Sequence, residues 1–256
     1  DLYPGSYSYK YPVPGVDNAE VKVLTFDIQR RATRTIDLPL EKDGYIPRIY
    51  FTKDPDKLAI MTLNRHQDRF DIYMANPRSC VSTLILRDEA PQYIEENAYG
   101  SIKFYDNNFV VQSEKSGFNH LYLYNLNGQL IKQVTSGNWD VTSFYGWDQA
   151  SNTFYFASNE GSPLRKNVYK IDGKGRKTRI TPKDGTNTAL FSANLKYFLN
   201  NWSDANTPNV YTLCDNTGNT LKTLVDNQKL NSLLAETELG TKEFFTFTTG
   251  EGVQLN

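Results

Sequence analysis

Two histidines and several carboxylates are the side chains of this 256-residue sequence with the clearest capacity for acid–base or ligand chemistry. His66 lies close to Asp68 and Asp71 in a polar run, which could supply a base or a ligand set, and His120 lies in another repeat of the chain. Serine chemistry needs a histidine that is held by an acid beside an exposed serine. Neither histidine has that context, so we interpret the His66 run as a solvated turn.

The adjacent carboxylates Glu95 and Glu96 form a second candidate pair. Paired carboxylates can bind an ammonium group through charge-assisted hydrogen bonds. The pair lies in a polar link, residues 88–97, so a solvated loop is the preferred interpretation. Asn201 opens an Asn-Trp-Ser sequon, whose use depends on the host.

Motifs that define common enzyme classes are missing from the sequence. It contains no G-x-S-x-G elbow, no Walker loop, no H-E-x-x-H and no Cys/His metal spacing. We therefore predict no catalytic residue, no metal ligand and no cofactor in this chain. Cys80 and Cys214 lie in different repeats and at different places within them, so we predict no disulfide.

Composition excludes two classes of partner. Lys and Arg number 28 and Asp and Glu 29, without a basic patch, which argues against nucleic acid. No apolar run approaches the roughly 20 residues that cross a membrane. The 17 Tyr and 14 Phe residues are typical of chains in which aromatic side chains fill the space between packed sheets.

A repeat organises the chain. Tyr73, Tyr122, Tyr169 and Tyr211 each lie in a strand-like run, at separations of 49, 47 and 42 residues. Each run is preceded by a strand-like run and followed by another, and Asn127-Gly128 is a strong hairpin signal within one repeat. A period in the forties with about four strands indicates β-propeller blades. The dipeptides Trp139-Asp140 and Trp147-Asp148 do not recur at this period, so WD repeats are excluded.

The sequence thus predicts an all-β propeller fragment with about four complete four-stranded antiparallel blades and a partial first blade. We expect eighteen to twenty strands, helix only within 88–97 and 227–238, and a last hairpin from 243–248 and 253–256. The first blade is expected to lack the two strands before Val21. The predicted parts are an arm with the partial blade (1–40), blades at 41–88, 89–137, 138–183 and 184–228, and a connector into a further domain (229–256).

Five segments carry a family resemblance. They are Tyr11-to-Val21 (YPVPGVDNAEV), 63–68 (LNRHQD), 136–141 (SGNWDV), 155–160 (YFASNE) and 167–171 (NVYKI). In that order they resemble the propeller segments YPKAGxxNPxV, LNRxQN, GxWxV, YYxSNE and NLYKI of the dipeptidyl peptidase IV family. Residues 244–247 and 252–256 resemble the start of that family's peptidase domain.

The resemblance implies part of a serine exopeptidase that removes X-Pro or X-Ala dipeptides from peptide N-termini. In that family an eight-bladed propeller caps an α/β-hydrolase domain and restricts access to an internal cavity. This chain would hold about the second half of the propeller. The catalytic residues would lie beyond Asn256, and the glutamates that hold the substrate's ammonium would lie before Asp1. We therefore expect the chain alone to be inactive.

The resemblance also implies two sets of site residues and several partners. Tyr99 and Lys103, in the link 88–104, are the substrate-binding candidates, whereas Glu95-Glu96 lies in the wrong blade to be the family's glutamate pair. The predicted dimerisation residues are in the arm: Tyr3, Tyr7, Tyr9 and Tyr11. The expected partners are peptide substrates, the chain's own C-terminal hydrolase domain and a second copy in a homodimer. The expected location is extracytoplasmic, either periplasmic or at the cell surface.

Two other functions remain open at this point. A stand-alone, TolB-like periplasmic propeller would act as a binding or scaffold module. A carbohydrate-active propeller would need carboxylates that project into the central channel from successive blades, and no acid recurs with that period.

Overall fold

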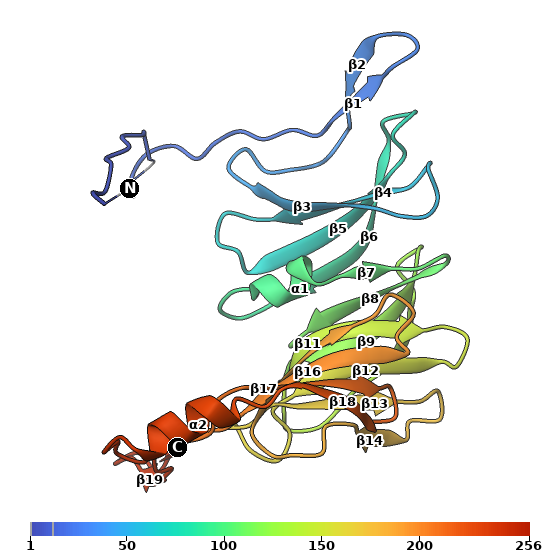
Figure 1. The fold of residues 1–256 in the computed structure, drawn as a ribbon. Coiled ribbons are helices and arrows are strands. Elements are labelled where there is room, and N and C mark those ends of the chain that lie inside the picture. Colours follow the sequence, from blue (N-terminus) through green and yellow to red (C-terminus); the bar gives the residue numbers. More distant parts are fainter. Residues whose placement is uncertain (1, 12) are drawn as a thin grey trace. The chain divides into compact units, whose positions relative to one another are not determined.

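The computed structural model describes residues 2–11 and 13–256, and the chain divides into two compact units, Asp1–Glu95 and Glu96–Asn256. Both units consist mainly of antiparallel strands (Figure 1). The described residues form twenty strands in six sheets, four of them four-stranded, and two helices. The predicted fold class, four complete blades and a partial first blade, is therefore confirmed.

The first unit contains a two-stranded sheet and a four-stranded sheet. The strands are β1 (Leu24–Asp27) and β2 (Ala32–Thr35), followed by β3 (Tyr45–Phe51), β4 (Leu58–Leu63), β5 (Arg69–Ala75) and β6 (Ser82–Glu89). Strands β3 to β6 pair in chain order, so β3 is an edge strand. An edge strand tolerates Pro47, which lies where the β3–β4 register shifts between Tyr45 and Arg48.

The core of the first unit joins its two sheets. Val23 and Ile36, at the ends of β1 and β2, pack with Leu58, Ile60 and Tyr73 of the larger sheet. All six residues of β4 are buried, as expected for a central strand whose two faces are both covered. This packing fixes the partial blade on the first complete one.

The second unit contains three four-stranded sheets. The first has β7 (Lys103–Phe104), β8 (Asn108–Ser113), β9 (His120–Asn125) and β10 (Leu130–Gln133). The next has β11 (Val141–Asp148), β12 (Thr153–Ser158), β13 (Asn167–Ile171) and β14 (Lys177–Arg179). The last has β15 (Thr186–Phe191), β16 (Tyr197–Ser203), β17 (Val210–Asp215) and β18 (Thr220–Val225). Strands pair in chain order within each sheet.

The tyrosine repeat corresponds to the third strand of each four-stranded sheet. Tyr73 lies in β5, Tyr122 in β9, Tyr169 in β13 and Tyr211 in β17. The predicted Asn127-Gly128 turn joins β9 to β10, and Gly128 has φ 84°, which a residue with a Cβ rarely adopts. The sequence period therefore reports the sheet repeat directly.

Two aromatic-rich cores hold the sheets of the second unit together. Trp139, Phe154 and Phe156 belong to the cluster shared by the first two sheets, and Tyr155 and Phe198 to the cluster shared by the last two. Aromatic rings in these clusters stack, for example Trp139 and Phe156 with centroids 6.0 Å apart. Successive sheets therefore pack face to face through aromatic side chains.

Two expected elements lie elsewhere or are shorter than predicted. The helix expected within 88–97 is α1 (Glu96–Gly100), which begins near the end of that range because 88–89 still belong to β6 and Ala98 is the buried residue of the turn. The second helix is α2 (Gln228–Ala235). The last hairpin is reduced to β19 (Phe247–Thr248) and β20 (Gln254–Leu255), because Phe244 and Phe245 are exposed and have no sheet face to pack on.

Candidate functional site

The His66 run forms the turn between β4 and β5. His66 is exposed, while the Asn64 Nδ2 donates to Asp68 Oδ1 at 2.6 Å and the Asn64 Oδ1 accepts from the backbone N–H of Asp68 and Arg69. Asp71 lies in β5 and is bound by Arg87. The carboxylates near His66 therefore have structural partners, and the turn interpretation is confirmed.

His120 is a buried structural residue. It is 1% exposed, its Nε2 donates to the Gly137 carbonyl at 3.0 Å, and its Nδ1 lies 3.1 Å from Thr135 Oγ1. The Trp139 ring packs edge-on against the imidazole, with centroids 5.0 Å apart. Both ring nitrogens are thus engaged within the sheet, so this histidine has no free nitrogen for proton transfer with a substrate.

The substrate-binding candidates lie on one short segment of the second unit. Tyr99 is half-buried in α1, and Lys103 is the first residue of β7. A hydrogen-bond chain fixes the segment, because the buried Gln112 of β8 donates to Ser101 Oγ, which donates to the Asn97 carbonyl at 2.6 Å. Neighbouring atoms partly desolvate the ammonium and lower the pKa of Lys103. The segment therefore presents an aromatic ring and a cation on a rigid support.

Glu95 and Glu96 are both exposed, as expected for a solvated link. The Tyr93 hydroxyl donates to Glu95 Oε1 at 2.8 Å.

The arm tyrosines are exposed. Residues 2–11 contain neither helix nor strand, and the exposed fractions are 80% for Tyr3, 86% for Tyr7, 70% for Tyr9 and 75% for Tyr11. Tyr7 and Tyr9 stack with ring centroids 5.8 Å apart, and Tyr9 meets Tyr11 edge-on at 6.4 Å. The arm therefore offers a row of aromatic surface that the described residues of its own unit leave uncovered.

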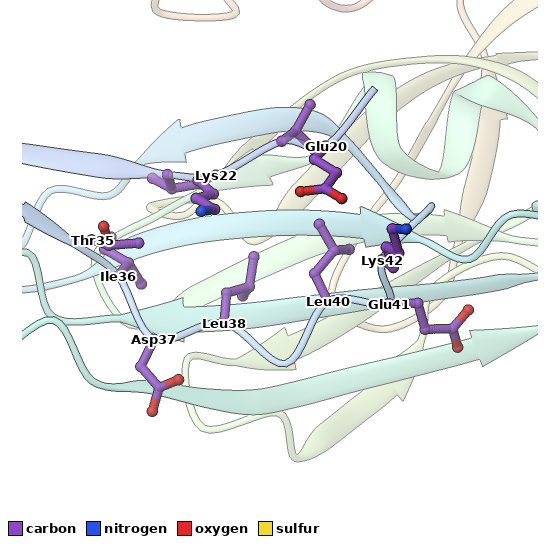
Figure 2. A pocket seen from close by; sticks show the side chains of 11 residues that line it. Glu20, Lys22, Thr35, Ile36, Asp37, Leu38, Leu40, Glu41 and Lys42 are labelled. Atoms are coloured by element: carbon purple, nitrogen blue, oxygen red, sulfur yellow. The ribbon is translucent and has the colours of Figure 1, made fainter. Parts of the chain in front are cut away.

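A pocket of about 490 Å³ lies in the first unit between residues 20–23 and 35–42 (Figure 2). Its lining contains leucine side chains and charges of both signs, with Glu20, Asp37 and Glu41 opposed by Lys22 and Lys42. Glu41 also forms an ion pair with Arg69. These nearly balanced charges give the pocket no clear preference for a cationic or an anionic ligand.

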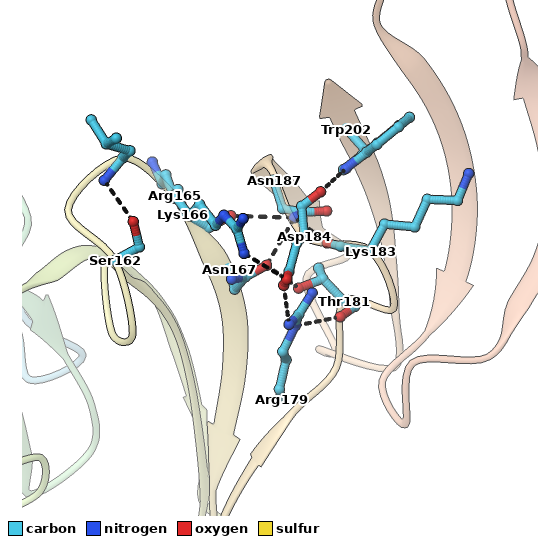
Figure 3. A network of polar contacts seen from close by, with 11 residues as sticks. Ser162, Arg165, Lys166, Asn167, Arg179, Thr181, Lys183, Asp184, Asn187 and Trp202 are labelled. Atoms are coloured by element: carbon cyan, nitrogen blue, oxygen red, sulfur yellow. Dashed lines mark hydrogen bonds and ion pairs between the residues drawn. The ribbon is translucent and has the colours of Figure 1, made fainter. Parts of the chain in front are cut away.

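Sequence reasoning missed a polar cluster around Asp184 in the second unit (Figure 3). Arg165 Nη1 donates to Asp184 Oδ2 at 2.7 Å, and Arg179 Nη1 donates to Oδ1 at 2.5 Å. The Trp202 indole N–H donates to the Asp184 carbonyl at 2.8 Å. The Nδ2 of the buried Asn187 lies within hydrogen-bond distance of three oxygens, including the Lys183 carbonyl at 3.0 Å, which share its two N–H donors. These residues come from the turn before β13, from β14, from the link before β15 and from β15 and β16, so no local motif could have predicted the cluster.

The described residues contain neither a metal-binding cluster nor a membrane-spanning helix. Within residues 2–11 and 13–256, no three His, Cys, Asp or Glu side chains are grouped so that they could hold a metal ion. Neither described helix has the length and apolar character needed to cross a membrane.

Comparison with known proteins places the chain in a family. Residues 1–209 match the family model described as dipeptidyl peptidase IV (DPP IV) N-terminal region. The chain belongs to this family. The resemblance carried by the five sequence segments is therefore confirmed, and the sheets described above form a DPP IV-like N-terminal region.

Relatives of the DPP IV N-terminal region include fungal and bacterial proteins. The probable dipeptidyl peptidase 4 of Trichophyton verrucosum is 27% identical over 99% of this chain and 35% of its own length. The crystal structure of Porphyromonas gingivalis dipeptidyl peptidase 4 matches with a TM-score of 0.93 and 43% identity, over 99% of this chain and 36% of that one. The chain thus spans about a third of the length of these relatives.

A second bacterial structure supports the fold alone. The putative dipeptidyl aminopeptidase IV of Bacteroides ovatus matches with a TM-score of 0.73 and 23% identity, over 85% of this chain and 34% of that one. It therefore agrees with the DPP IV-like arrangement of sheets.

Proposed function

We propose that this chain is the propeller part of a DPP IV-like serine exopeptidase that releases X-Pro or X-Ala dipeptides from peptide N-termini. The observation that carries the proposal is the 43% identity to the Porphyromonas gingivalis dipeptidyl peptidase 4 over nearly the whole chain. The role of the chain is to restrict substrate access to a catalytic α/β-hydrolase domain encoded beyond Asn256. The buried, fully engaged His120 and the exposed turn position of His66 support a catalytic centre outside these sheets.

Two experiments test this function: sequencing the gene beyond the codon for Asn256, and assaying the full-length product for peptidase activity. The gene should encode a G-x-S-x-G segment, the nucleophile elbow of α/β-hydrolases. The full-length product should release p-nitroaniline from Gly-Pro-p-nitroanilide and leave the N-acetylated substrate intact. A gene that ends near Asn256 would instead favour a stand-alone binding propeller, and a full-length product without dipeptide release would refute the proposed activity.

Within this function, Tyr99 and Lys103 contact the peptide as it approaches the catalytic centre. Their support is the rigid α1–β7 segment and the partly desolvated ammonium of Lys103. In the full-length enzyme, Tyr99→Ala and Lys103→Gln should raise KM for peptide substrates roughly threefold or more and leave kcat unchanged, because they remove uniform binding. Lys222→Gln, at an exposed position of β18, is the matched control. Unchanged KM in both variants would exclude this role.

The proposed enzyme is a homodimer located outside the cytoplasm, in the periplasm or at the cell surface. Dimerisation uses the arm, whose exposed tyrosines provide apolar surface for a second copy. Fractionation of the source cells, followed by detection of the protein in periplasmic, surface and cytoplasmic fractions, tests the location. A purely cytoplasmic signal would refute it.

A further inference from the structure

A second pocket, separate from the segment that carries Tyr99 and Lys103, lies in the second unit. Its volume is about 390 Å³, within the range of small-molecule sites. Its walls come from the turn 164–165 after β12, the link 184–186 before β15, the turn 204–207 after β16 and the chain at 242–244. Four segments that are distant in sequence therefore converge on it.

Hydrogen bonds fix the wall formed by the C-terminal segment. The Asn206 side chain binds both backbone groups of Lys242, since its Oδ1 accepts from the Lys242 N–H at 2.9 Å and its Nδ2 donates to the Lys242 carbonyl at 3.0 Å. Asp204 Oδ1 in turn accepts from the Asn206 N–H at 2.9 Å. The pocket wall is thus built by paired polar contacts and not by chance proximity.

Two cations, Arg165 and Lys242, and two carboxylates, Asp184 and Asp204, line this pocket. The neighbouring cations Arg179 and Lys183, which interact with these carboxylates, make the surroundings net positive. Asp184 already shares its carboxylate between Arg165 and Arg179. The Arg179 Nη2 is buried and has no hydrogen-bond partner among the described residues. The ammonium of Lys242 has no hydrogen bond or ion pair with any residue that the structure describes. Of these two groups, Lys242 lines the pocket and has a donor available for a further anion.

Asp204, the second acidic residue of the pocket, is stabilised in its ionised form. Hydrogen bonds from Thr207 and Asn206 lower the pKa of Asp204, and Lys183 contributes to this shift. Lys183 itself lies over the Trp202 ring, 4.5 Å from its centroid. Asp204 is thus engaged by its own loop. Of the two cations in the lining, Arg165 shares Asp184 with Arg179, and Lys242 has no ion pair among the described residues.

The pocket also has an apolar side. Leu164 and Phe244 line it and are 39% and 66% exposed. An apolar group of a bound ligand would remove this surface from water, which lowers the free energy of the complex.

We propose that this pocket binds a small organic carboxylate that carries an apolar group, with Arg165 and Lys242 on the carboxylate and Leu164 and Phe244 on the apolar group. Arginine suits a carboxylate because its planar donors match the two oxygens. The site does not depend on the proposed peptidase function.

Isothermal titration of the purified chain with N-acetyl-leucine, N-acetyl-leucine amide and inorganic phosphate tests the proposal. N-acetyl-leucine should bind with a Kd of about 1 mM or lower. The neutral amide should bind at least roughly tenfold more weakly, since the charge-assisted hydrogen bonds are lost. Phosphate should also bind at least roughly tenfold more weakly, because it lacks the apolar group.

Substitutions on the pocket rim complete the test. The double variant Arg165→Gln/Lys242→Gln should weaken N-acetyl-leucine binding at least roughly tenfold. Lys229→Gln, at an exposed position of α2, should change it less than about twofold. Circular dichroism verifies that each variant is folded. Equal binding of acid and amide, phosphate binding as tight as that of the acid, an unchanged double variant, or no binding of the acid at about 10 mM would each overturn the proposal.

Discussion

Single tyrosine hydroxyls tie neighbouring sheets of the second unit together. The Tyr105 hydroxyl, just after β7, accepts from the Trp147 N–H of β11 at 2.8 Å. The Tyr145 hydroxyl of β11 accepts from the Ala189 N–H of β15 at 3.2 Å. Burial raises the pKa of both phenols, that of Tyr105 to about 12. Each hydroxyl therefore stays neutral and satisfies a backbone donor of the next sheet.

Removing one of these hydroxyls tests its contribution. Tyr105→Phe leaves the Trp147 N–H without its acceptor, so the free energy of unfolding should fall by about 1–3 kcal/mol. Urea unfolding followed by circular dichroism measures this change. Tyr93→Phe removes an exposed hydrogen bond to Glu95 and should cost less than about 0.5 kcal/mol. Similar losses in the two variants would contradict the role of Tyr105.

The raised pKa of Tyr105 also predicts a pH dependence. The folded-state value of about 12 exceeds the ordinary value of 10.0, so the folded protein binds more protons between these values. The contribution of Tyr105 is complete below about pH 10 and is lost as pH rises toward about 12. Unfolding experiments across this range should show a steeper loss of stability for the native sequence than for Tyr105→Phe. Parallel curves would contradict the prediction.

In the first unit, Arg87 is the principal partner of the buried carboxylate of Asp71, and Arg69 Nε lies farther away, 3.9 Å from Asp71 Oδ2. Arg87 Nε and Nη2 donate to its two oxygens at 2.7 and 2.8 Å, and Asp71 is 4% exposed. Arg87→Ala should therefore lower the free energy of unfolding by about 1–3 kcal/mol, less than for a fully buried pair because Arg87 is partly exposed. Arg78→Ala, which removes an exposed pair with Asp56, should cost less than about 0.5 kcal/mol. Equal losses of unfolding free energy in Arg87→Ala and Arg78→Ala, measured by urea unfolding, would contradict the prediction that the Asp71–Arg87 pair contributes more.

Among the elements, the N-terminal arm is the one whose apolar surface most clearly needs a partner. If the arm mediates dimerisation, the intact chain should be a dimer by multi-angle light scattering, and deletion of residues 1–10 should make it a monomer. The alternative cause is the uncovered sheet surface at the ends of the chain, such as Leu24 of β1 and Leu190 of β15, which are 58% and 70% exposed. An unchanged dimer after deletion would assign association to these surfaces, and a monomeric intact chain would exclude both.

Strands could be predicted from the sequence where their apolar pattern is local and repeated. The tyrosine period located β5, β9, β13 and β17, because each third strand repeats the same packing. The boundary of α1 was missed, since a five-residue helix depends on the burial of Ala98 more than on propensity. The extent of the β19–β20 hairpin was also missed, because pairing beyond Phe247 needs a packing partner that local sequence does not reveal.

The candidate sites were harder to predict from the sequence than the fold was. Tyr99 and Lys103 followed from a family resemblance, whereas the Asp184 cluster and its neighbouring pocket unite turns that are far apart in the chain. Such a cluster forms only when two four-stranded sheets pack and bring their connecting turns to one end. Its residues, from strands and from turns, show no common pattern in the sequence.

For the whole molecule, we propose that these sheets belong to a dipeptidyl peptidase whose catalytic centre lies outside residues 1–256. The most direct measurement is turnover of Gly-Pro-p-nitroanilide by the purified chain and, under the same conditions, by the full-length gene product. We predict turnover by the full-length protein and none above background by the chain of residues 1–256. Turnover that co-purifies with the chain through successive columns, or its absence from the full-length protein, would contradict the account.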